Sequence, residues 1–279
     1  MKFHKYQAIG NDYLVIDGAS GQLTSSLVRR ICDRHFGIGS DGILLGAQAP
    51  SDRGFVLRIF NPDGSEAEKS GNGIRIFARY LWDSGLVGGE FFSVLTKGGQ
   101  VRCQVRDNGK HVFVEMGRAS FQSVDIPVAG TPREVVDEHH DIGNEALRIT
   151  GVSVGNPHCV VHVDVATPEV AHRLGPLIEN HAMFPNRTNV QFVKVLGPQR
   201  IRIEIWERGA GYTLASGSSA CAAAAASVRL GLCNGEIMVD MPGGTLQVGV
   251  GPDFSLTMLG PAKKVASGDI SNELLENTG

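Results

Sequence analysis

The sequence lacks three features that would indicate particular classes of protein. It has no excess of either charge, because 26 Lys and Arg stand against 29 Asp and Glu in 279 residues, a net charge of −3 without a run of like charge. Nucleic acid and acidic membrane surfaces are therefore not expected as partners. The longest apolar run, residues 220–228, is far shorter than the roughly 20 residues that a bilayer span requires. The opening MKFHKYQAIGND has no apolar signal core, so we expect a cytoplasmic protein.

Cysteine pairs with metal-binding or redox spacing are also absent. The five cysteines are scattered and form no CxxC pair, which indicates reduced thiols and no zinc site. Two of them, Cys159 and Cys221, are expected to pack in the core. The pair His139-His140 lies in a polar stretch, residues 133–141, without further ligands at metal spacing. We expect it on a solvated loop or helix face.

The sequence does contain an internal repeat at a shift of about 146 residues, in a chain long enough for two domains. Each half begins with Gly-Asn before a strand-like segment, at Asn11 and at Asn156. Each half then continues with a helix-like segment, over residues 27–36 and 171–184. The protein is therefore expected to be built twice.

The strongest match joins two Ser-Gly pairs, each of which precedes a helical pattern. Ser70 and Ser216 lie 146 positions apart, and each follows by nine positions a polar residue at the end of a strand, Asn61 or Glu207. Serine is favoured at a helix N-cap because its oxygen accepts a hydrogen bond from an otherwise unpaired amide. Helices are expected over residues 74–82 and 220–230.

Short alternating segments between Gly, Pro and Asp predict strands in mixed or antiparallel sheets. They are residues 92–96, 101–105, 112–116, 237–241 and 246–250. We expect an α+β protein of two pseudo-symmetric domains, each a curved sheet wrapped around a central, small-residue helix. The first domain should comprise residues 1–118, with the tail 264–279 returning to it, and the second residues 119–263.

Two equivalent helix starts favour one kind of chemistry. Helix N-termini attract anions, so a carboxylate held between Gly71-Asn72-Gly73 and Gly217-Ser218-Ser219 would be neutralised from both sides. An acid or base in each half could then reach opposite faces of one carbon. The repeat therefore predicts stereochemical inversion, as in a racemase or epimerase, better than it predicts hydrolysis.

Several motifs together resemble the diaminopimelate epimerase family. They occur in the expected order over residues 8 to about 222, and they are Ala8-Ile-Gly-Asn-Asp12, Phe60-Asn-Pro-Asp-Gly-Ser65, Gly71-Asn-Gly73, Gly155-Asn-Pro-His158, Arg187-Thr-Asn189 and Glu207-Arg-Gly-Ala-Gly211. The resemblance implies a two-domain, pyridoxal-phosphate-independent enzyme that needs no cofactor and has its active site at the domain interface. It implies an amino-acid substrate and a role in lysine biosynthesis. A homodimeric partner stays open.

The resemblance also implies roles for individual residues. Those that would hold the non-reacting end of the substrate are Asn11, Asn61, Asn156, Asn189 and Arg208. Those that would surround the reacting carboxylate are Gly71, Asn72, Gly217 and Ser218. His158 and Glu207 match residues that assist the two catalytic groups.

The departure from the family lies at Ser70 and Ser216, because the two catalytic residues of the family are cysteines. A thiol has a reference pKa of about 8.5 and can be lowered further at a helix N-terminus, whereas an aliphatic hydroxyl is far less acidic. The swap should weaken α-proton abstraction, unless Glu207 or His158 activates the serine. A divergent branch and a deliberate Cys-to-Ser pair both account for it.

Other interpretations of the same residues stay open. The serines act only as helix caps if the chemistry has been lost, and the chain is then an amino-acid-binding homologue without turnover. Alternatively, the scaffold serves a different isomerase or proton-transfer enzyme, with Glu207 or His158 as base and a more acidic carbon as substrate. The four asparagines could be turn formers, and His158 a structural residue at a strand entry.

Overall fold

The computed structural model describes residues 1–17, 23–48 and 54–276, and the chain divides into two compact units. Unit 1 consists of Met1–Val114 with Gly260–Gly279, and unit 2 of Glu115–Leu259. The divisions fall inside β8 (His111–Arg118) and β17 (Ser255–Pro261), a few residues before the positions 118 and 263 that the sequence pattern indicates.

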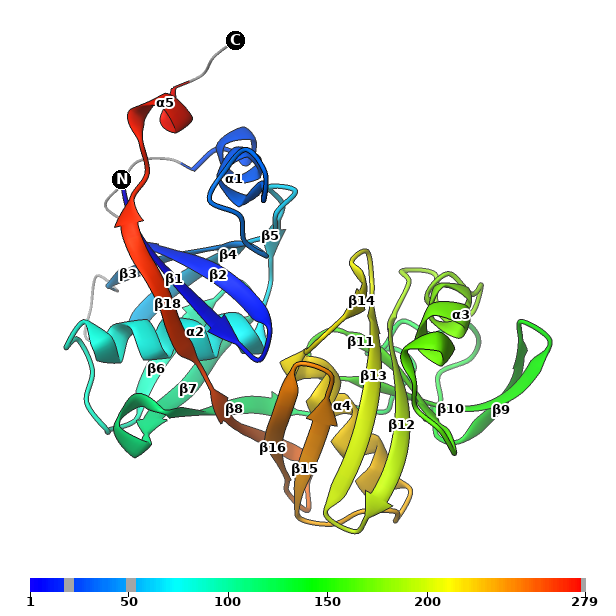
Figure 1. The fold of residues 1–279 in the computed structure, drawn as a ribbon. Helices are drawn as coiled ribbons and strands as arrows, with labels where there is room; N and C mark the ends of the chain where they lie inside the picture. Colours follow the sequence, from blue (N-terminus) through cyan, green and yellow to red (C-terminus); the bar gives the residue numbers. More distant parts are fainter. Residues whose placement is uncertain (18–22, 49–53, 277–279) are drawn as a thin grey trace. The chain divides into compact units, whose positions relative to one another are not determined.

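The strands of unit 1 pair in the order β18-β1-β2-β3-β4-β6-β7-β8 (Figure 1). Neighbours are antiparallel except β2–β3 and β4–β6, which are parallel and joined through α1 and α2, as parallel strands need a crossover connection. The bounds are β1 Lys2–Ala8, β2 Asn11–Asp17, β3 Ile43–Gln48, β4 Phe55–Phe60, β5 Glu66–Ala67, β6 Phe92–Thr96, β7 Gly99–Arg106 and β18 Lys263–Asp269. The short β5 extends β4 as a hairpin, and η1 (Asp107–Gly109) joins β7 to β8.

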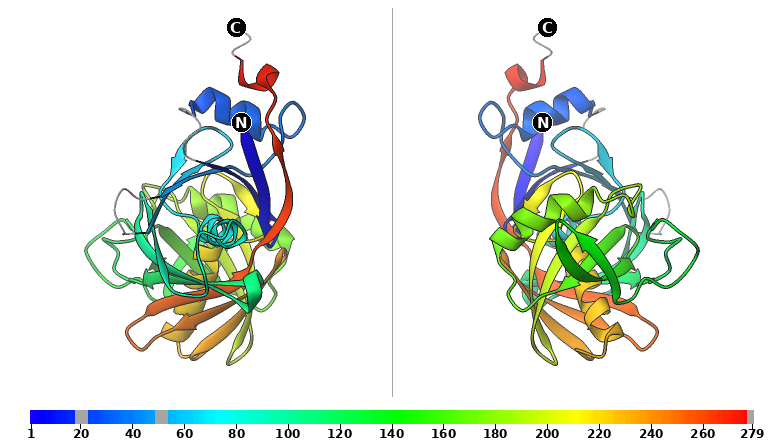
Figure 2. Two further views of the ribbon diagram at one scale, coloured as in Figure 1. Left: turned by 90° about the vertical axis from the view of Figure 1, so that its left-hand side faces the viewer. Right: turned by 90° about the vertical axis from the view of Figure 1, so that its right-hand side faces the viewer.

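Helix α2 (Gly71–Asp83) is the central helix of unit 1. Its residues 71–78 are all buried, and it packs against β1, β2, β3 and β7. The left view of Figure 2 looks nearly down α2 and shows the strands of this unit curving around it. Helix α1 (Ser25–Cys32) buries Val28, Ile31 and Cys32 in a separate cluster with Leu14, Ile16 and the short α5 (Asn272–Leu275).

Unit 2 repeats the arrangement, with strands in the order β9-β10-β11-β12-β13-β15-β16-β17. The parallel pairs are β11–β12 and β13–β15, and again a helix lies in the connection between the two strands of each pair. Strand β14 extends β13 as a hairpin, as β5 extends β4. The bounds are β9 Glu138–Ile142, β10 Glu145–Ser153, β11 Pro157–His162, β12 Asn189–Gly197, β13 Arg200–Glu207, β14 Gly211–Thr213, β15 Glu236–Met241 and β16 Gly244–Val250. The α+β fold of two pseudo-symmetric units, predicted from the repeat, is confirmed.

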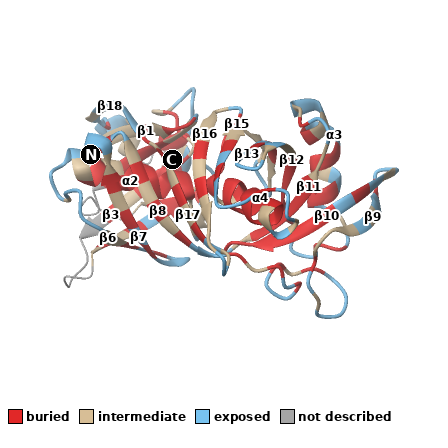
Figure 3. Cartoon of the chain, turned by 90° about the horizontal axis from the view of Figure 1, so that it is seen from below, coloured by how far each residue is buried: buried red, intermediate tan, exposed pale blue. Residues whose placement is uncertain are grey.

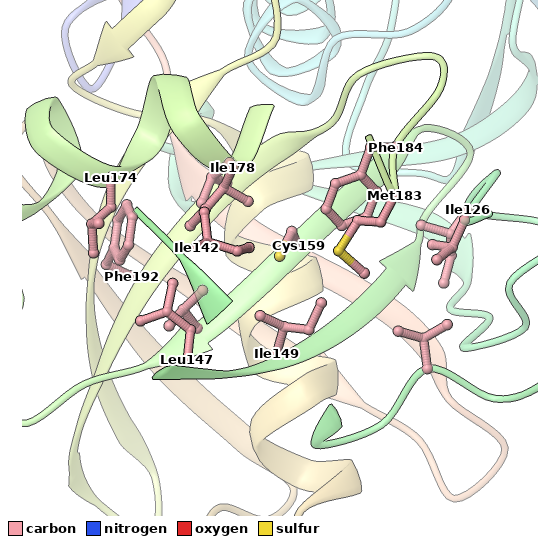
Figure 4. Packing of buried hydrophobic residues seen from close by; sticks show 14 of the residues in the cluster. Ile126, Ile142, Leu147, Ile149, Cys159, Leu174, Ile178, Met183, Phe184 and Phe192 are labelled. Atoms are coloured by element: carbon pink, nitrogen blue, oxygen red, sulfur yellow. The ribbon is translucent and has the colours of Figure 1, made fainter. Parts of the chain in front are cut away.

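Helix α4 (Gly217–Arg229) is the counterpart of α2 and begins 146 positions later. Its alanines 220 and 222–226 are fully buried, because small side chains let the sheet backbone approach on every side; Figure 3 shows the burial along the helix. The opposite face of the sheet is covered by α3 (Pro168–Glu179), whose Leu174 and Ile178 pack with the strands in the cluster of Figure 4. Cys159 in that cluster and Cys221 in α4 are both buried, as the sequence predicts.

Three local predictions need correction. The helix predicted over residues 27–36 ends at Cys32, because the carboxylate of Asp33 accepts the amides of His35 and Phe36 and turns the chain. The helix predicted over residues 171–184 is α3, which begins three residues earlier at a favourable N-terminal proline and ends at Glu179. His139 and His140 lie on strand β9, not on a loop or helix.

Candidate functional site

Ser70 caps the first turn of α2. Its backbone is extended, and its Oγ accepts a hydrogen bond from the amide of Gly73 at 3.0 Å. The hydroxyl of Tyr13 lies 3.5 Å from the same oxygen. A Cβ at position 73 would lie 3.1 Å from Leu44 and 3.3 Å from Ser70 Oγ, so glycine keeps space beside the serine. The half-buried hydroxyl therefore stands at a helix start where negative charge is favoured.

Two predicted binding residues of unit 1, Asn11 and Asn72, are joined directly. The side-chain amide of Asn72 donates to Oδ1 of Asn11 at 3.1 Å, and Nδ2 of Asn11 donates to Asp41 at 2.8 Å. The fully buried Arg75 donates to Oδ1 of Asn72 at 2.8 Å and also to the carbonyl of Gly71. The orientation of both asparagine amides follows from this network.

A charged cluster supports Asn11 from behind. Arg34 donates to the carboxylates of both Asp12 and Asp41, and Lys5 pairs with Asp12 at 2.9 Å. Burial raises the pKa of Asp12, but the hydrogen bonds from Arg34 and Lys5 outweigh it and hold that pKa below its usual value. The loop that carries Asn11 is thus fixed by ionised groups.

Asn61 stabilises a turn of its own. Its side chain donates to Ser65 Oγ at 3.0 Å, and the hydroxyl of Ser65 donates to Asp63 at 2.6 Å. The backbone amide of Asn61 also donates to the carbonyl of Ser65. This geometry matches the turn-forming role that the sequence left open, and it fixes a half-buried amide at the end of β4.

Ser216 occupies the equivalent cap in unit 2, at the start of α4. Its Oγ lies 3.4 Å from the amide of Ser219, which donates to it, and 3.4 Å from the hydroxyl of Ser218. Ser216 is 5% exposed, whereas Ser70 is half-buried. The hydroxyl of Ser219 accepts a hydrogen bond from Gln191 on β12 at 3.0 Å, which ties the cap to the sheet.

His158 lies fully buried on β11, two residues after Asn156. Its Nε2 is 3.0 Å from Oδ1 of Asn156, an acceptor, so the network assigns the proton to Nε2. Burial lowers the pKa of His158 to about 3; a hydrogen-bonding interaction with Gln191 opposes the shift, and the charge of Arg208 adds to it. The imidazole is therefore neutral at physiological pH and able to accept a proton only when a strong acid forms beside it.

Asn189 links β11 to the turn after β13. It lies opposite His158 in the parallel register, and its Nδ2 donates to the carbonyl of Pro157 at 2.8 Å. Its Oδ1 accepts the backbone amide of Arg208 at 3.0 Å. The guanidinium of Arg208 is exposed and donates to the carbonyl of Asn186, while Glu207 is half-buried at the end of β13.

One residue of this region was not predicted from the sequence. Glu179, at the end of α3 and 5% exposed, accepts hydrogen bonds from the indole of Trp206 at 2.7 Å, the amide of Gly209 at 2.9 Å and Arg187 at 3.1 Å. It thereby fixes the turn that presents Glu207 and Arg208. A helix that ends in a lone acidic residue carries no distinguishing signal, so only the fold reveals this contact.

The predicted residues therefore form groups within each unit. In unit 1, Asn72 bonds to Asn11, and Arg75 bonds to both Asn72 and Gly71, beside the cap Ser70. In unit 2, Asn156 pairs with His158, and Asn189 pairs with Arg208. At the start of α4, Ser218 follows Gly217 and lies beside the cap Ser216. Asn61 and Glu207 end equivalent strands. Within residues 1–17, 23–48 and 54–276, no cluster of three or more His, Cys, Asp and Glu could hold a metal ion. No helix of this described part is long and apolar enough to span a bilayer.

The caps differ in strength, which predicts unequal effects on stability. Ser70→Ala is expected to lower the free energy of unfolding by about 1 kcal/mol, because an amide of the first helical turn loses its acceptor. Ser216→Ala should cost less, since its bond is 3.4 Å long against 3.0 Å at Ser70. Urea denaturation measures both, and Ser70→Thr, which keeps a cap oxygen, is the control. An equal loss at both positions would contradict the geometry.

The buried neutral imidazole predicts a pH dependence. The pKa of His158 lies near 3 in the fold, below its ordinary 6.5, so the unfolded chain binds a proton that the folded chain does not. Stability is therefore complete above pH 6.5 and falls as the pH drops towards 3, by about 2 kcal/mol between pH 7 and pH 5. Denaturation curves at the two pH values should show a smaller drop for His158→Gln. The exposed His139→Gln should keep the full drop.

The sequence matches one family model and several known proteins. The family model described as diaminopimelate epimerase matches residues 3–122 and 150–265. A protein from Nostoc sp., "Diaminopimelate epimerase 2", is 54% identical over 276 residues, which are 98% of this chain and 97% of that protein. The "Diaminopimelate epimerase" of Moorella thermoacetica is 42% identical over 96% of this chain and 99% of its own length.

Solved structures share the fold at low identity. A hydroxyproline epimerase from Agrobacterium vitis, solved with bound trans-4-hydroxy-L-proline, superposes with a TM-score of 0.72 at 16% identity, over 97% of this chain and 92% of that chain. A predicted epimerase from Pseudomonas aeruginosa gives a TM-score of 0.69 at 18% identity, over 96% and 98%. These likenesses carry the fold only.

Proposed function

We propose, from the premise that this chain belongs to the diaminopimelate epimerase family, that it inverts an α-carbon of diaminopimelate or of a closely related amino acid without a cofactor. One acid–base group from each unit acts on that carbon. One removes the α-proton and the other returns a proton to the opposite face. The single observation that carries the proposal is the repeat of a serine-capped buried helix, at Ser70 and Ser216, in two units of the same strand order.

The first turns of α2 and α4 supply the electrostatic part of this function. The amides after each serine, at Gly71-Asn72 and Gly217-Ser218, favour an anion, so they would bind the reacting carboxylate. When the α-proton leaves, its electron pair moves into that carboxylate as an enediolate. Donors already aimed at the growing charge stabilise it without reorganisation.

The polar side chains fixed by the fold would recognise the other end of the substrate. We assign this role to Asn11, Asn61, Asn156, Asn189 and Arg208. Asn11 and Asn189 are each held by hydrogen bonds within their units, so little conformational entropy is lost on binding. The exposed guanidinium of Arg208 suits a second carboxylate, such as the distal one of diaminopimelate.

His158 and Glu207 have supporting roles in this proposal. The depressed pKa of His158 keeps it neutral, so it orients Asn156 through its Nε2–H and does not add a permanent charge. Glu207 is half-buried and next to Arg208, which suits a residue that orients the substrate amine or the acid–base group of its unit.

The test is α-deuterium incorporation in deuterium oxide. Diaminopimelate and a panel of amino acids are incubated with the protein, and the products are read by mass spectrometry and chiral chromatography. We expect exchange and inversion in diaminopimelate and none in the other amino acids, and none with Ser70→Ala/Ser216→Ala. Saturable binding by calorimetry without exchange in any substrate would reject the proposal in favour of a binding protein. Exchange that survives in the double-alanine variant would transfer the acid–base role to Glu207 or His158.

A further inference from the structure

Tyr13 holds a phenol beside Ser70. Its hydroxyl lies 3.5 Å from Ser70 Oγ, and its side chain is 6% exposed. The ring is seated against Gly42, where a Cβ would lie 2.7 Å from a ring carbon, so glycine is needed to leave room for it. Hydroxyl pairs in the resting state of an active site are often longer than the 2.5–3.0 Å of a formed bond and shorten when substrate binds.

The repeat places Tyr13 in a meaningful position. It stands two residues after Asn11 on β2, as His158 stands two residues after Asn156 on β11. Each strand belongs to a parallel pair, β2 with β3 and β11 with β12, and each pair precedes the serine-capped helix of its unit. Each unit therefore carries a buried side chain able to hold a proton at the same point of the fold.

From this geometry we infer that Tyr13 is the proton-relay partner of Ser70, a residue that acts on the substrate through the serine hydroxyl. The inference rests on the proposed function and deepens it. Ser70 alone is a poor base, because an aliphatic hydroxyl gives up its proton far less readily than a thiol. A phenol, with a reference pKa of about 10, is far more acidic than an aliphatic hydroxyl, and Tyr13 on β2 places one 3.5 Å from the hydroxyl of Ser70.

The step balances as follows. After the phenol of Tyr13 has released its proton to solvent, Ser70 Oγ takes the α-proton while its own proton passes to the phenolate oxygen, and the carbon's electron pair enters the substrate carboxylate. The net change is one proton moved from carbon to Tyr13: the C–H bond breaks, a C=C bond forms to the carboxyl carbon, and the C=O π pair becomes a lone pair on oxygen. In the reverse direction the phenol donates to Ser70, and Ser70 protonates the carbanion.

The charged and titratable groups on the surrounding elements have partners of their own. Tyr6 is the register partner of Tyr13 on β1, but its hydroxyl donates to Asp83, and burial together with that bond raises its pKa. Asp41, in the turn before β3, forms an ion pair with Arg34. Arg75 is fully buried in the first turns of α2, where it donates to Asn72 and to the carbonyl of Gly71.

A double-mutant cycle tests the relay. Tyr13→Phe keeps the ring and removes only the hydroxyl, and we expect it to lower kcat for α-proton exchange by roughly 100-fold with KM unchanged. In a Ser70→Cys background the thiol supplies its own acidity, so the same substitution should leave kcat nearly unchanged. Tyr6→Phe is the matched control, because it removes a buried phenol that bonds to Asp83 at 2.9 Å, and exchange should not change.

Each outcome is decisive. A loss of equal size in the Ser70 and Ser70→Cys backgrounds means that Tyr13 only supports the fold, and it overturns the relay. An active protein in which Tyr13→Phe has no effect on kcat also overturns the relay, although the proposed function then stands. An inactive protein that becomes active as Ser70→Cys/Ser216→Cys also rejects the relay, because the serine pair has then no competence of its own. Absence of exchange in both forms rejects the proposed function itself.

Discussion

Replacing Ser70 and Ser216 together with cysteine is expected to raise the rate of α-proton exchange by at least ~100-fold, the lower end of what a well-placed acid–base group contributes. Both positions cap a 13-residue buried helix. A thiol there has a reference pKa of about 8.5, lowered by the positive end of the helix, so thiolate forms near neutral pH. The surrounding binding residues are unchanged, so the gain should be in kcat and not in KM.

The measurement is deuterium incorporation and inversion of diaminopimelate by the double variant and by each single variant. Ser271→Cys is the control, since that serine caps the short α5 and bonds to the amide of Leu274 away from the proposed chemistry. It should leave exchange as it is. If the double variant were no faster than the parent, a missing thiolate would not be what limits the reaction, and the assignment of the two caps as acid–base positions would fail.

Replacing Glu179 with glutamine is expected to lower the free energy of unfolding by about 2 kcal/mol and to raise KM. One carboxylate oxygen accepts from Arg187 and Gly209, and the other from Trp206. A glutamine has a donor in place of one acceptor, so either amide orientation opposes a donor to a donor. The turn that carries Arg208 should loosen, which weakens substrate binding before it affects chemistry.

Glu204 provides the matched comparison for this effect. It is 6% exposed in the same unit, and burial raises its pKa. It accepts one hydrogen bond from Tyr212 at 2.7 Å, which a glutamine oxygen can also accept. Glu204→Gln should therefore be nearly neutral in urea denaturation and in KM. Equal losses for the two variants would show that Glu179 fills space and does not hold the turn.

The sequence alone was sufficient to predict the repeat, because the repeated positions carry residue types that few other residues can replace. A glycine-asparagine pair before a strand and a serine before a buried helix recur at the same spacing, and the structure places Ser70 and Ser216 at helix caps as expected. The run of alanines 222–226 in α4 also predicted its burial, since such small side chains let the surrounding sheet come close.

Contacts between residues that are distant in the sequence could not be predicted from the sequence. Glu179 and Trp206 are 27 positions apart, and Tyr13 and Ser70 are 57 positions apart; no periodicity links either pair. Strand β9 was missed for another reason. Its sequence, EHHDI, is polar because it pairs with β10 alone within unit 2, and strands at a sheet edge commonly carry charged side chains.

The pairing of β18 with β1 sets the order in which the molecule can be completed as it is synthesised. The two strands match Lys2 with Asp269 and Phe3 with Gly268, so the edge of unit 1 stays open until residues made after the whole of unit 2 have emerged. Domains usually finish from the N-terminus onwards during translation. Here the second unit is complete first, and the first waits, with β1 exposed along one side, for the chain to return.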